Sequence, residues 1–411
     1  MKHTKSGLAL GILLMLAVLV GLVATPSAQA QSYTVLHNFA GSPDGEFPYA
    51  GLIRDNAGSF YGTTADGGYH LAGTAFKLDK TGKEHALYSF TGVFDGGGVL
   101  GGVVEDPAGN LYGTTVGGGG TGEGVIFEVF AVGGEATLYS FTGGPDGGNP
   151  LAGVLRDAAG NLYGTAETGG DPSCKCGTVF KFNGRPLTVL HSFRGGTDGA
   201  TPESGLLRDT AGNFYGTTTS GGGGTLCGSS VGCGTVFEVA QSGKEKVLYS
   251  FTGVADGANP VGGLIMDQEG NLYGTTVFGG NMSCPIQPSG CGTVFKVDPS
   301  GKETVLYSFT GEADGANPYD SLVMDAAGNL YGTTDLGGNL LCGGNVGCGT
   351  VFKLDTTGML TVLHSFSGGE GANPVGGLVI DTASNLYGTT KSGGASKACR
   401  GGCGVVFEVT P

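Results

Sequence analysis

A Tyr-Gly-Thr motif recurs seven times along this chain, with its tyrosines at Tyr61, Tyr112, Tyr163, Tyr215, Tyr273, Tyr331 and Tyr387. Successive tyrosines are separated by 51, 51, 52, 58, 58 and 56 residues, so one unit is repeated with small insertions. Self-similarity at such a period indicates a repeat architecture, because a single unit cannot bury its apolar faces alone. The repeat therefore overrides the division into several domains that the length of 411 residues would suggest.

Each copy contains four short runs with strand character, bounded by Gly, Asp, Asn and Pro. In the fifth copy these runs are PVGGLIMD (260–267), NLYGTT (271–276), CGTVFKVD (291–298) and KETVLYSF (302–309). Four antiparallel strands per repeat predict an all-β fold, a seven-bladed β-propeller with four strands in each blade. We expect the glycine beside each motif tyrosine to let adjacent sheets approach closely around the axis.

The two ends of the repeated region complement each other. Residues 33–39 match the fourth run without the first three, and residues 404–410 match the third run without a fourth. We therefore expect the N-terminal strand to complete the last blade and close the ring, which removes the open sheet edges of a linear stack.

Residues 1–30 have the character of a secretory signal peptide. Lys2 and Lys5 precede an apolar stretch at 8–24, and Ala28-Gln29-Ala30 supplies the small residues of a cleavage site. A transmembrane anchor is the alternative, because 17 apolar residues could just span a bilayer. The sequence predicts a signal peptide at 1–30, one propeller domain at 31–411, and a secreted or periplasmic protein.

The repeat GNLYGTT..GG....GTVFKVD..GK..VLYSFTG.DGANP..GL..D resembles that of the secreted bacterial GloVer-repeat proteins, which carry a choice of anchors. The resemblance covers residues 33–411, and the P..GL..D..GNLY portion is more loosely similar to NHL and two-component-regulator propeller repeats. It implies export and, commonly, a C-terminal anchor, whereas this sequence ends at Pro411 without a hydrophobic tail. The resemblance implies no particular activity.

The formal charge of −15 argues against partners with anionic surfaces. Such a chain repels phosphate backbones and anionic headgroups, so we expect neither nucleic-acid binding nor membrane insertion after signal cleavage. Extracellular protein or polysaccharide remains the expected partner.

In a propeller, the loops from each fourth strand to the next first strand share a face with the loops between second and third strands. We call this the variable face, because loop length and composition vary there, which is typical of a recognition surface. Ten cysteines fall in pairs within these loops, as Cys174/Cys176, Cys227/Cys233, Cys284/Cys291, Cys342/Cys348 and Cys399/Cys403. Pairing within single loops of an exported chain predicts five disulfides, although one residue between Cys174 and Cys176 makes that bridge strained. Metal binding by the thiolates is the alternative.

Two sets of aspartates recur with the repeat. One set ends the first run and is expected to cap the following hairpin. The other set begins the DG turns, where oxygen-rich loops could hold calcium, although turn chemistry explains them without an ion. The calcium candidates are Asp44, Asp146, Asp256 and Asp314. No other cofactor is indicated.

Candidate site residues are those that depart from the repeat, because one active site needs one set of groups. The departures occur where VGGL enters the first strand, and they are Tyr49, Glu203, Ser204, Tyr319, Asp320 and Ser321. We expect them at the channel mouth on the variable face, as ligand contacts. Tyr69 is a further aromatic candidate, in a chain that has no Trp.

The sequence thus favours a secreted, non-enzymatic propeller that binds or scaffolds extracellular protein or polysaccharide. The alternative is an extracellular glycoside hydrolase or lyase that uses Glu203 and Asp320 as acid and base. A calcium-stabilised scaffold is a third hypothesis. The residues alone do not identify the ligand or the oligomeric state.

Overall fold

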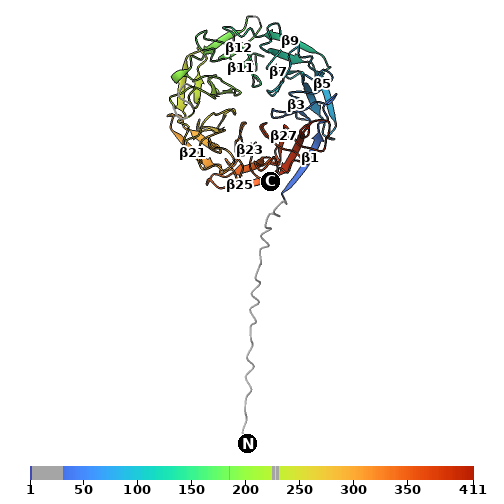
Figure 1. Ribbon diagram of the computed structural model, residues 1–411, viewed down its shortest axis with the longest axis vertical. Helices are drawn as coiled ribbons and strands as arrows, with labels where there is room; N and C mark the ends of the chain where they lie inside the picture. Colours follow the sequence, from blue (N-terminus) through green and yellow to red (C-terminus); the bar gives the residue numbers. More distant parts are fainter. Residues whose placement is uncertain (2–30, 185, 225–226, 228–230) are drawn as a thin grey trace.

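Seven four-stranded antiparallel sheets stand around a central axis in the computed structural model, as Figure 1 shows. The structure describes residues 1, 31–184, 186–224, 227 and 231–411. The predicted signal peptide at 1–30 lies, apart from Met1, outside the described residues. Seven blades of four strands confirm the predicted seven-bladed β-propeller.

The first two strands of each blade are the inner ones. The first strands are β2 (Ile53–Arg54), β6 (Val104–Glu105), β10 (Leu155–Arg156), β14 (Leu207–Arg208), β18 (Ile265–Met266), β22 (Val323–Met324) and β26 (Val379–Ile380). The second strands, which contain the Tyr-Gly-Thr motif, are β3 (Phe60–Thr64), β7 (Leu111–Thr115), β11 (Leu162–Ala166), β15 (Phe214–Thr218), β19 (Leu272–Thr276), β23 (Leu330–Thr334) and β27 (Leu386–Thr390).

The third and fourth strands form the outer half of each blade. The third strands are β4 (Thr74–Leu78), β8 (Val125–Val129), β12 (Thr178–Phe182), β16 (Thr235–Val239), β20 (Thr293–Val297), β24 (Thr350–Leu354) and β28 (Val405–Thr410). The fourth strands are β5 (Glu84–Ser89), β9 (Glu135–Ser140), β13 (Thr188–Ser192), β17 (Glu245–Ser250), β21 (Glu303–Ser308), β25 (Leu360–Ser365) and β1 (Ser32–Asn38). A 3-10 turn, η1 (Gly196–Asp198), lies between the third and fourth blades.

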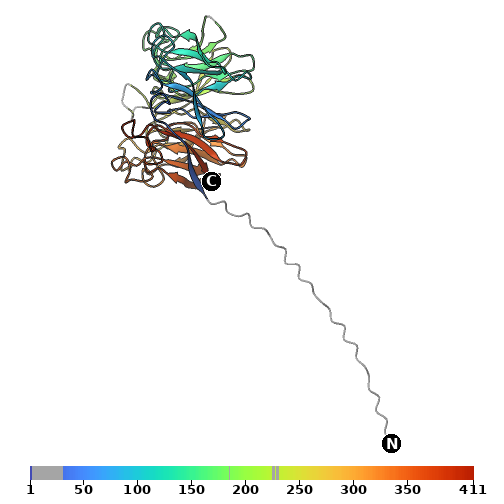
Figure 2. The same cartoon turned by 90° about the vertical axis from the view of Figure 1, so that its right-hand side faces the viewer.

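The ring closes through the two ends of the chain. Strand β1 pairs antiparallel with β28, from Ser32 opposite Thr410 to Asn38 opposite Val405, and completes the sheet β1-β28-β27-β26. Figure 2, an edge-on view, shows this N-terminal strand beside the C-terminus. The predicted closure by the N-terminal strand is therefore confirmed.

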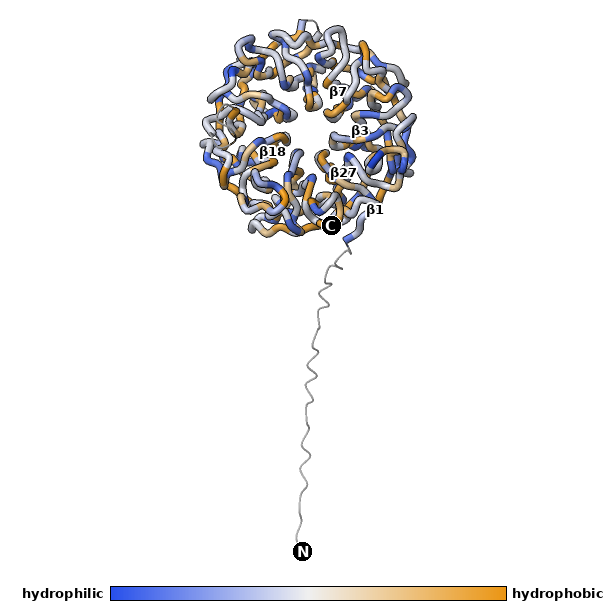
Figure 3. Tube along the Cα trace, viewed as in Figure 1, coloured by the Kyte–Doolittle hydropathy of each residue, from blue (hydrophilic) through white to orange (hydrophobic). Residues whose placement is uncertain are grey.

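Phenylalanine pairs hold neighbouring blades together. Phe39, which follows β1, meets Phe76 of β4 edge to face with ring centroids 5.1 Å apart, and both rings are fully buried. The same pair recurs at all seven blade boundaries. Burial of two such rings per boundary is a large apolar contribution to stability. Figure 3 shows hydrophobic segments in every blade around the ring.

The glycine beside each motif tyrosine has a different neighbour from the one predicted. A Cβ on Gly62 would lie 2.7 Å from Cζ of Phe76, which is on the next strand of the same blade. The glycine therefore makes room for this core ring, and our expectation of contact with an adjacent sheet was wrong. Close approach around the axis instead involves the entry glycines, since a Cβ on Gly101 would lie 2.4 Å from the nitrogen of Gly153 in the next blade.

The first run of each copy is mostly not strand. In the fifth copy only Ile265 and Met266 pair with β19, whereas the preceding glycines lie at the rim of the channel. These entry segments are joined by motif threonines, because Thr63 Oγ1 donates to the carbonyl of Gly101 at 2.9 Å. The bond recurs at other blade boundaries, and Thr389 donates to Ala50 where the ring closes.

The recurring aspartates have structural partners. Asp106 accepts the amides of Ala108 and Asn110 at 2.8 and 2.9 Å, which confirms the predicted hairpin cap. The calcium candidates are engaged in the same way. Asp256, for example, accepts the Thr252 amide at 2.7 Å and the Tyr249 hydroxyl at 3.0 Å, and Asp44, Asp146 and Asp314 have equivalent bonds. These contacts are the turn chemistry that the sequence favours.

Five disulfides link the cysteines in the pairs that the spacing predicts: Cys174–Cys176, Cys227–Cys233, Cys284–Cys291, Cys342–Cys348 and Cys399–Cys403. They lie in the variable-face loops of the third to seventh blades. Within the part of the chain that the structure describes, no helix is long and apolar enough to cross a bilayer.

Candidate functional site

The channel mouth on the variable face opens into a cavity of about 560 Å³ that receives residues from all seven blades. Its size is within the range of small-ligand sites. All six of the predicted ligand contacts line it: Tyr49, Glu203, Ser204, Tyr319, Asp320 and Ser321. Departures from the repeat that are up to 272 residues apart in sequence therefore converge on one place.

An ion pair and a tyrosine form one side of the mouth. Lys391 Nζ lies 3.5 Å from Oδ1 of Asp335 and 5.9 Å from the ring centroid of Tyr49. Burial raises the pKa of Asp335, although the Lys391 charge opposes the shift. Tyr49 is 38% exposed, so its ring is accessible to a ligand.

Glu203 and Tyr319 form another part of the wall. Oε1 of Glu203 accepts the Thr219 hydroxyl at 2.9 Å. Burial, and to a lesser extent the charge of Glu167, raises the pKa of Glu203. Burial also raises the pKa of Tyr319, and the charges of Asp335 and Glu203 add to this shift.

Asp320 has a structural contact that the sequence did not reveal. Its Oδ1 accepts the amide of Ser321, and its Oδ2 accepts the amide of Gly377 in the next blade. Burial raises the pKa of Asp320, while these amide bonds oppose the shift. Because both carboxylate oxygens hold backbone amides across a blade boundary, the side chain is poorly placed to act as a freely titrating acid or base.

The two predicted serines also contact protein. Ser204 is 2% exposed, and its hydroxyl accepts the Thr217 amide at 3.0 Å. Ser321 packs closely on the fifth blade, because a Cβ on Gly263 would lie 2.7 Å from Ser321 Oγ. We therefore assign both serines a structural role at the wall, while Tyr49, Glu203 and Tyr319 are only partly buried at the cavity.

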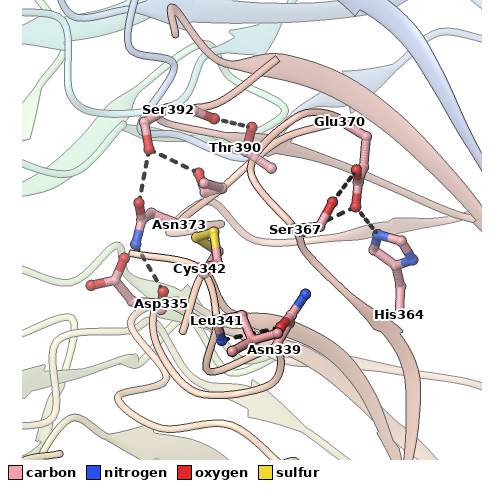
Figure 4. Close-up of a disulfide and its surroundings, with 12 residues drawn as sticks. Asp335, Asn339, Leu341, Cys342, His364, Ser367, Glu370, Asn373, Thr390 and Ser392 are labelled. Carbon is pink, nitrogen blue, oxygen red and sulfur yellow. Dashed lines mark hydrogen bonds and ion pairs between the residues drawn. A yellow bond between two sulfur atoms is a disulfide. The ribbon is translucent and has the colours of Figure 1, made fainter. Parts of the chain in front are cut away.

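An asparagine lies beside the ion pair, and Figure 4 shows its side chain between Asp335 and Ser392, near Cys342. Asn373 Nδ2 donates to the carbonyl of Asp335 at 3.0 Å, and Asn373 Oδ1 accepts the hydroxyl of Ser392 at 2.8 Å. One side chain therefore holds the backbone carbonyl of Asp335 and the hydroxyl of Ser392, the residue that follows Lys391. Asn149, Asn259 and Asn317 make equivalent bonds to the preceding blade.

Sequence reasoning missed a second circle of variable residues around the mouth. These residues directly follow the second strands, and they are Ala65, Val116, Glu167, Thr219, Val277, Asp335 and Lys391. Comparison of the seven copies at this one position would have found the charged members. The charged residues were missed because this position, directly after a strand, looks like the start of a loop.

The fold and this mouth define a closed seven-bladed propeller whose non-repeated side chains meet at one end of its channel. The model of the Gloeobacter/Verrucomicrobia repeat matches residues 20–228 and 223–411. The chain therefore belongs to this repeat family, as the GloVer resemblance predicts. A search of curated proteins finds no significant match.

Solved structures show the same fold at low identity. The extracellular domain of BT4673 from B. thetaiotaomicron superposes with a TM-score of 0.55 at 13% identity, over 91% of this chain and 40% of the other. A second structure of that domain gives 0.53 at 15% identity, over 92% of this chain and 39% of the other. The present chain thus spans about two fifths of the BT4673 chains. XC5397 of Xanthomonas campestris, a gluconolactonase, is less similar, with a TM-score of 0.42 at 12% identity over 92% of this chain and 89% of the other.

Proposed function

We propose that this protein is an extracellular binding module that holds its ligand at the channel mouth of the variable face. The observation that carries the proposal is the convergence of Tyr49, Glu203 and Tyr319 on one cavity. These residues come from three different blades and stand where the other four copies have leucine or valine. Disulfides in five of the seven loops between second and third strands fit an oxidising compartment. Extracellular protein or polysaccharide is the proposed class of partner.

The hydrolase or lyase alternative is less well supported. It needs Glu203 and Asp320 as a working pair, and both oxygens of Asp320 accept backbone amides. Burial is the main cause of the raised pKa of Glu203, and the carboxylate charge that adds to it is that of Glu167, not that of Asp320. We therefore retain binding as the function that the geometry supports best.

The proposal is tested with the purified protein on a glycan array and against culture-supernatant proteins. The comparison is between the native protein, Glu203→Gln, and Glu269→Gln as a matched control. Glu269 is exposed on a hairpin of the opposite face, so both variants lose one negative charge. A ligand retained by the control and lost by Glu203→Gln supports the proposal. A ligand that both variants bind equally would place the function elsewhere.

A further inference from the structure

The channel mouth has an excess of negative charge. Lys391 is paired with Asp335, so these two charges largely cancel. Among the described residues, no lysine or arginine forms an ion pair with Glu167 or Glu203. A ligand with a positively charged group would therefore find uncompensated carboxylates at the mouth. The Lys391 ammonium above the Tyr49 ring shows that an aromatic face at this rim accepts a cation.

Aliphatic side chains form much of the remaining cavity lining. Leu100 and Leu151 occupy the positions equivalent to Tyr49 and Glu203 in the second and third blades, and Leu52, Val103 and Val154 follow farther along the entry segments. A ligand that fits both the acidic groups and the aliphatic lining has a cationic end on an apolar stem. Among the common groups of biological polymers, the lysine side chain has this character.

The variable face also carries an exposed apolar patch over the first two blades. We define it as Tyr69, Leu71, Val93 and Phe94, which are 73%, 65%, 55% and 76% exposed. Its two loops are in contact, because the Gly98 amide donates to the carbonyl of Ala72 at 3.1 Å. Exposed aliphatic and aromatic side chains grouped in this way mark protein interaction surfaces.

We propose that the ligand is a basic protein that lies on the variable face, covers the apolar patch and inserts one lysine side chain into the channel mouth toward Glu203. The inference rests on the proposed function, since it assigns a ligand class to the same site. The charge of −15 favours a basic partner and disfavours a second copy of this chain. The aliphatic part of the patch favours a polypeptide over a polysaccharide.

The probe is a blocked decapeptide with a single central lysine flanked by leucine and phenylalanine. Binding to the full protein is measured by isothermal titration calorimetry at physiological salt. The comparison peptide carries acetyl-lysine, which keeps the stem and removes the charge. We expect the acetylated peptide to bind at least about tenfold more weakly, because a charge-assisted contact is lost.

Variants test the contact with Glu203 and the contact with the apolar patch separately. Glu203→Gln should weaken binding of the lysine peptide about tenfold, whereas Glu269→Gln should leave it within about twofold. Phe94→Ser should weaken binding several-fold, and Val132→Ser is its control, because Val132 is 97% exposed on an opposite-face hairpin. Circular dichroism and the melting temperature establish that each variant is folded.

Two results would overturn the inference. Equal binding of the lysine and acetyl-lysine peptides would show that the lysine ammonium is not recognised. Equal effects of Glu203→Gln and Glu269→Gln would show that binding depends on the overall charge of the protein and not on a contact with Glu203. If a glycan, but no lysine peptide, depends on Glu203, this inference fails while the proposed function stands. If no ligand of any class depends on Glu203, both fail.

Discussion

The change Glu84→Gln tests a buried acidic contact between blades. Glu84 begins β5 in the first blade and lies beside Asp44, which is in the loop that arrives from the seventh blade. Burial, followed by the charge and a hydrogen bond of Asp44, raises the pKa of Glu84 from 4.5 to about 8. Similar contacts raise the pKa of Glu245 and Glu303 to about 7.

The direction of the effect follows from linkage. In the unfolded chain Glu84 ionises near pH 4.5, whereas in the folded protein it stays protonated until about pH 8. Folding stability therefore falls as the pH rises through this window. Between pH 4.5 and pH 7 the loss, at about 1.4 kcal/mol for each pH unit, amounts to about 3 kcal/mol before solvent screening reduces it. The amide of the variant keeps a donor toward Asp44 and does not ionise.

We expect Glu84→Gln to match the native protein in unfolding free energy at pH 4.5 and to exceed it by about 1 to 3 kcal/mol at pH 7.5. Urea unfolding at both pH values, with disulfides intact and circular dichroism as the probe, measures this difference. The contact between His37 and Asp44, at 3.1 Å, is present in both proteins, so its contribution largely cancels. Glu269→Gln is the exposed control. An effect of Glu84→Gln that is the same at both pH values would refute the reasoning.

Three further changes test the packing of the ring and the mouth. Gly62→Ala should destabilise the protein by about 1 to 3 kcal/mol in urea unfolding, because the new methyl would lie 2.7 Å from the Phe76 ring; a neutral change would contradict the tight contact. Asn317→Ala should lower the free energy of unfolding by about 1 to 3 kcal/mol in the same assay, because it removes a buried hydrogen bond between blades at a residue whose φ is +54°. Asn317→Gly should lower it less, since glycine tolerates that φ. Equal losses for the two variants would contradict a contribution from the backbone conformation. Lys391→Met should lower the melting temperature at pH 7.5 more than at pH 4.5, because Asp335 would be buried without a partner and an unpaired buried carboxylate is unfavourable when it is ionised. A shift in melting temperature that does not depend on pH would contradict a stabilising ion pair.

Most of the fold could be predicted because its determinants are local and repeated. The Tyr-Gly-Thr motif, the aspartate that ends each first run and the two incomplete ends together specify four strands per copy, seven copies and closure through β1. The role of Gly62 was misassigned because its contact, Phe76, is set by strand register rather than by sequence distance. The length of the first strand was overestimated because glycines at the channel rim look like part of a strand.

The site could be predicted only in part. Tyr49, Glu203 and Tyr319 were visible because they interrupt a constant motif. Lys391 was missed because it follows a strand, at a position where the copies vary and no motif is interrupted. The bonds of Asp320 to the next blade could not be read from the sequence, because they depend on how closely two entry segments approach around the axis.

The crystal structure of the protein with the ligand that the array, supernatant or peptide experiments select tests the central claim most directly. We expect ligand density in the channel mouth, in contact with Glu203 and with at least one of Tyr49 and Tyr319. Density on the hairpin face or at the outer edge of the blades, with the mouth open to solvent, would contradict it.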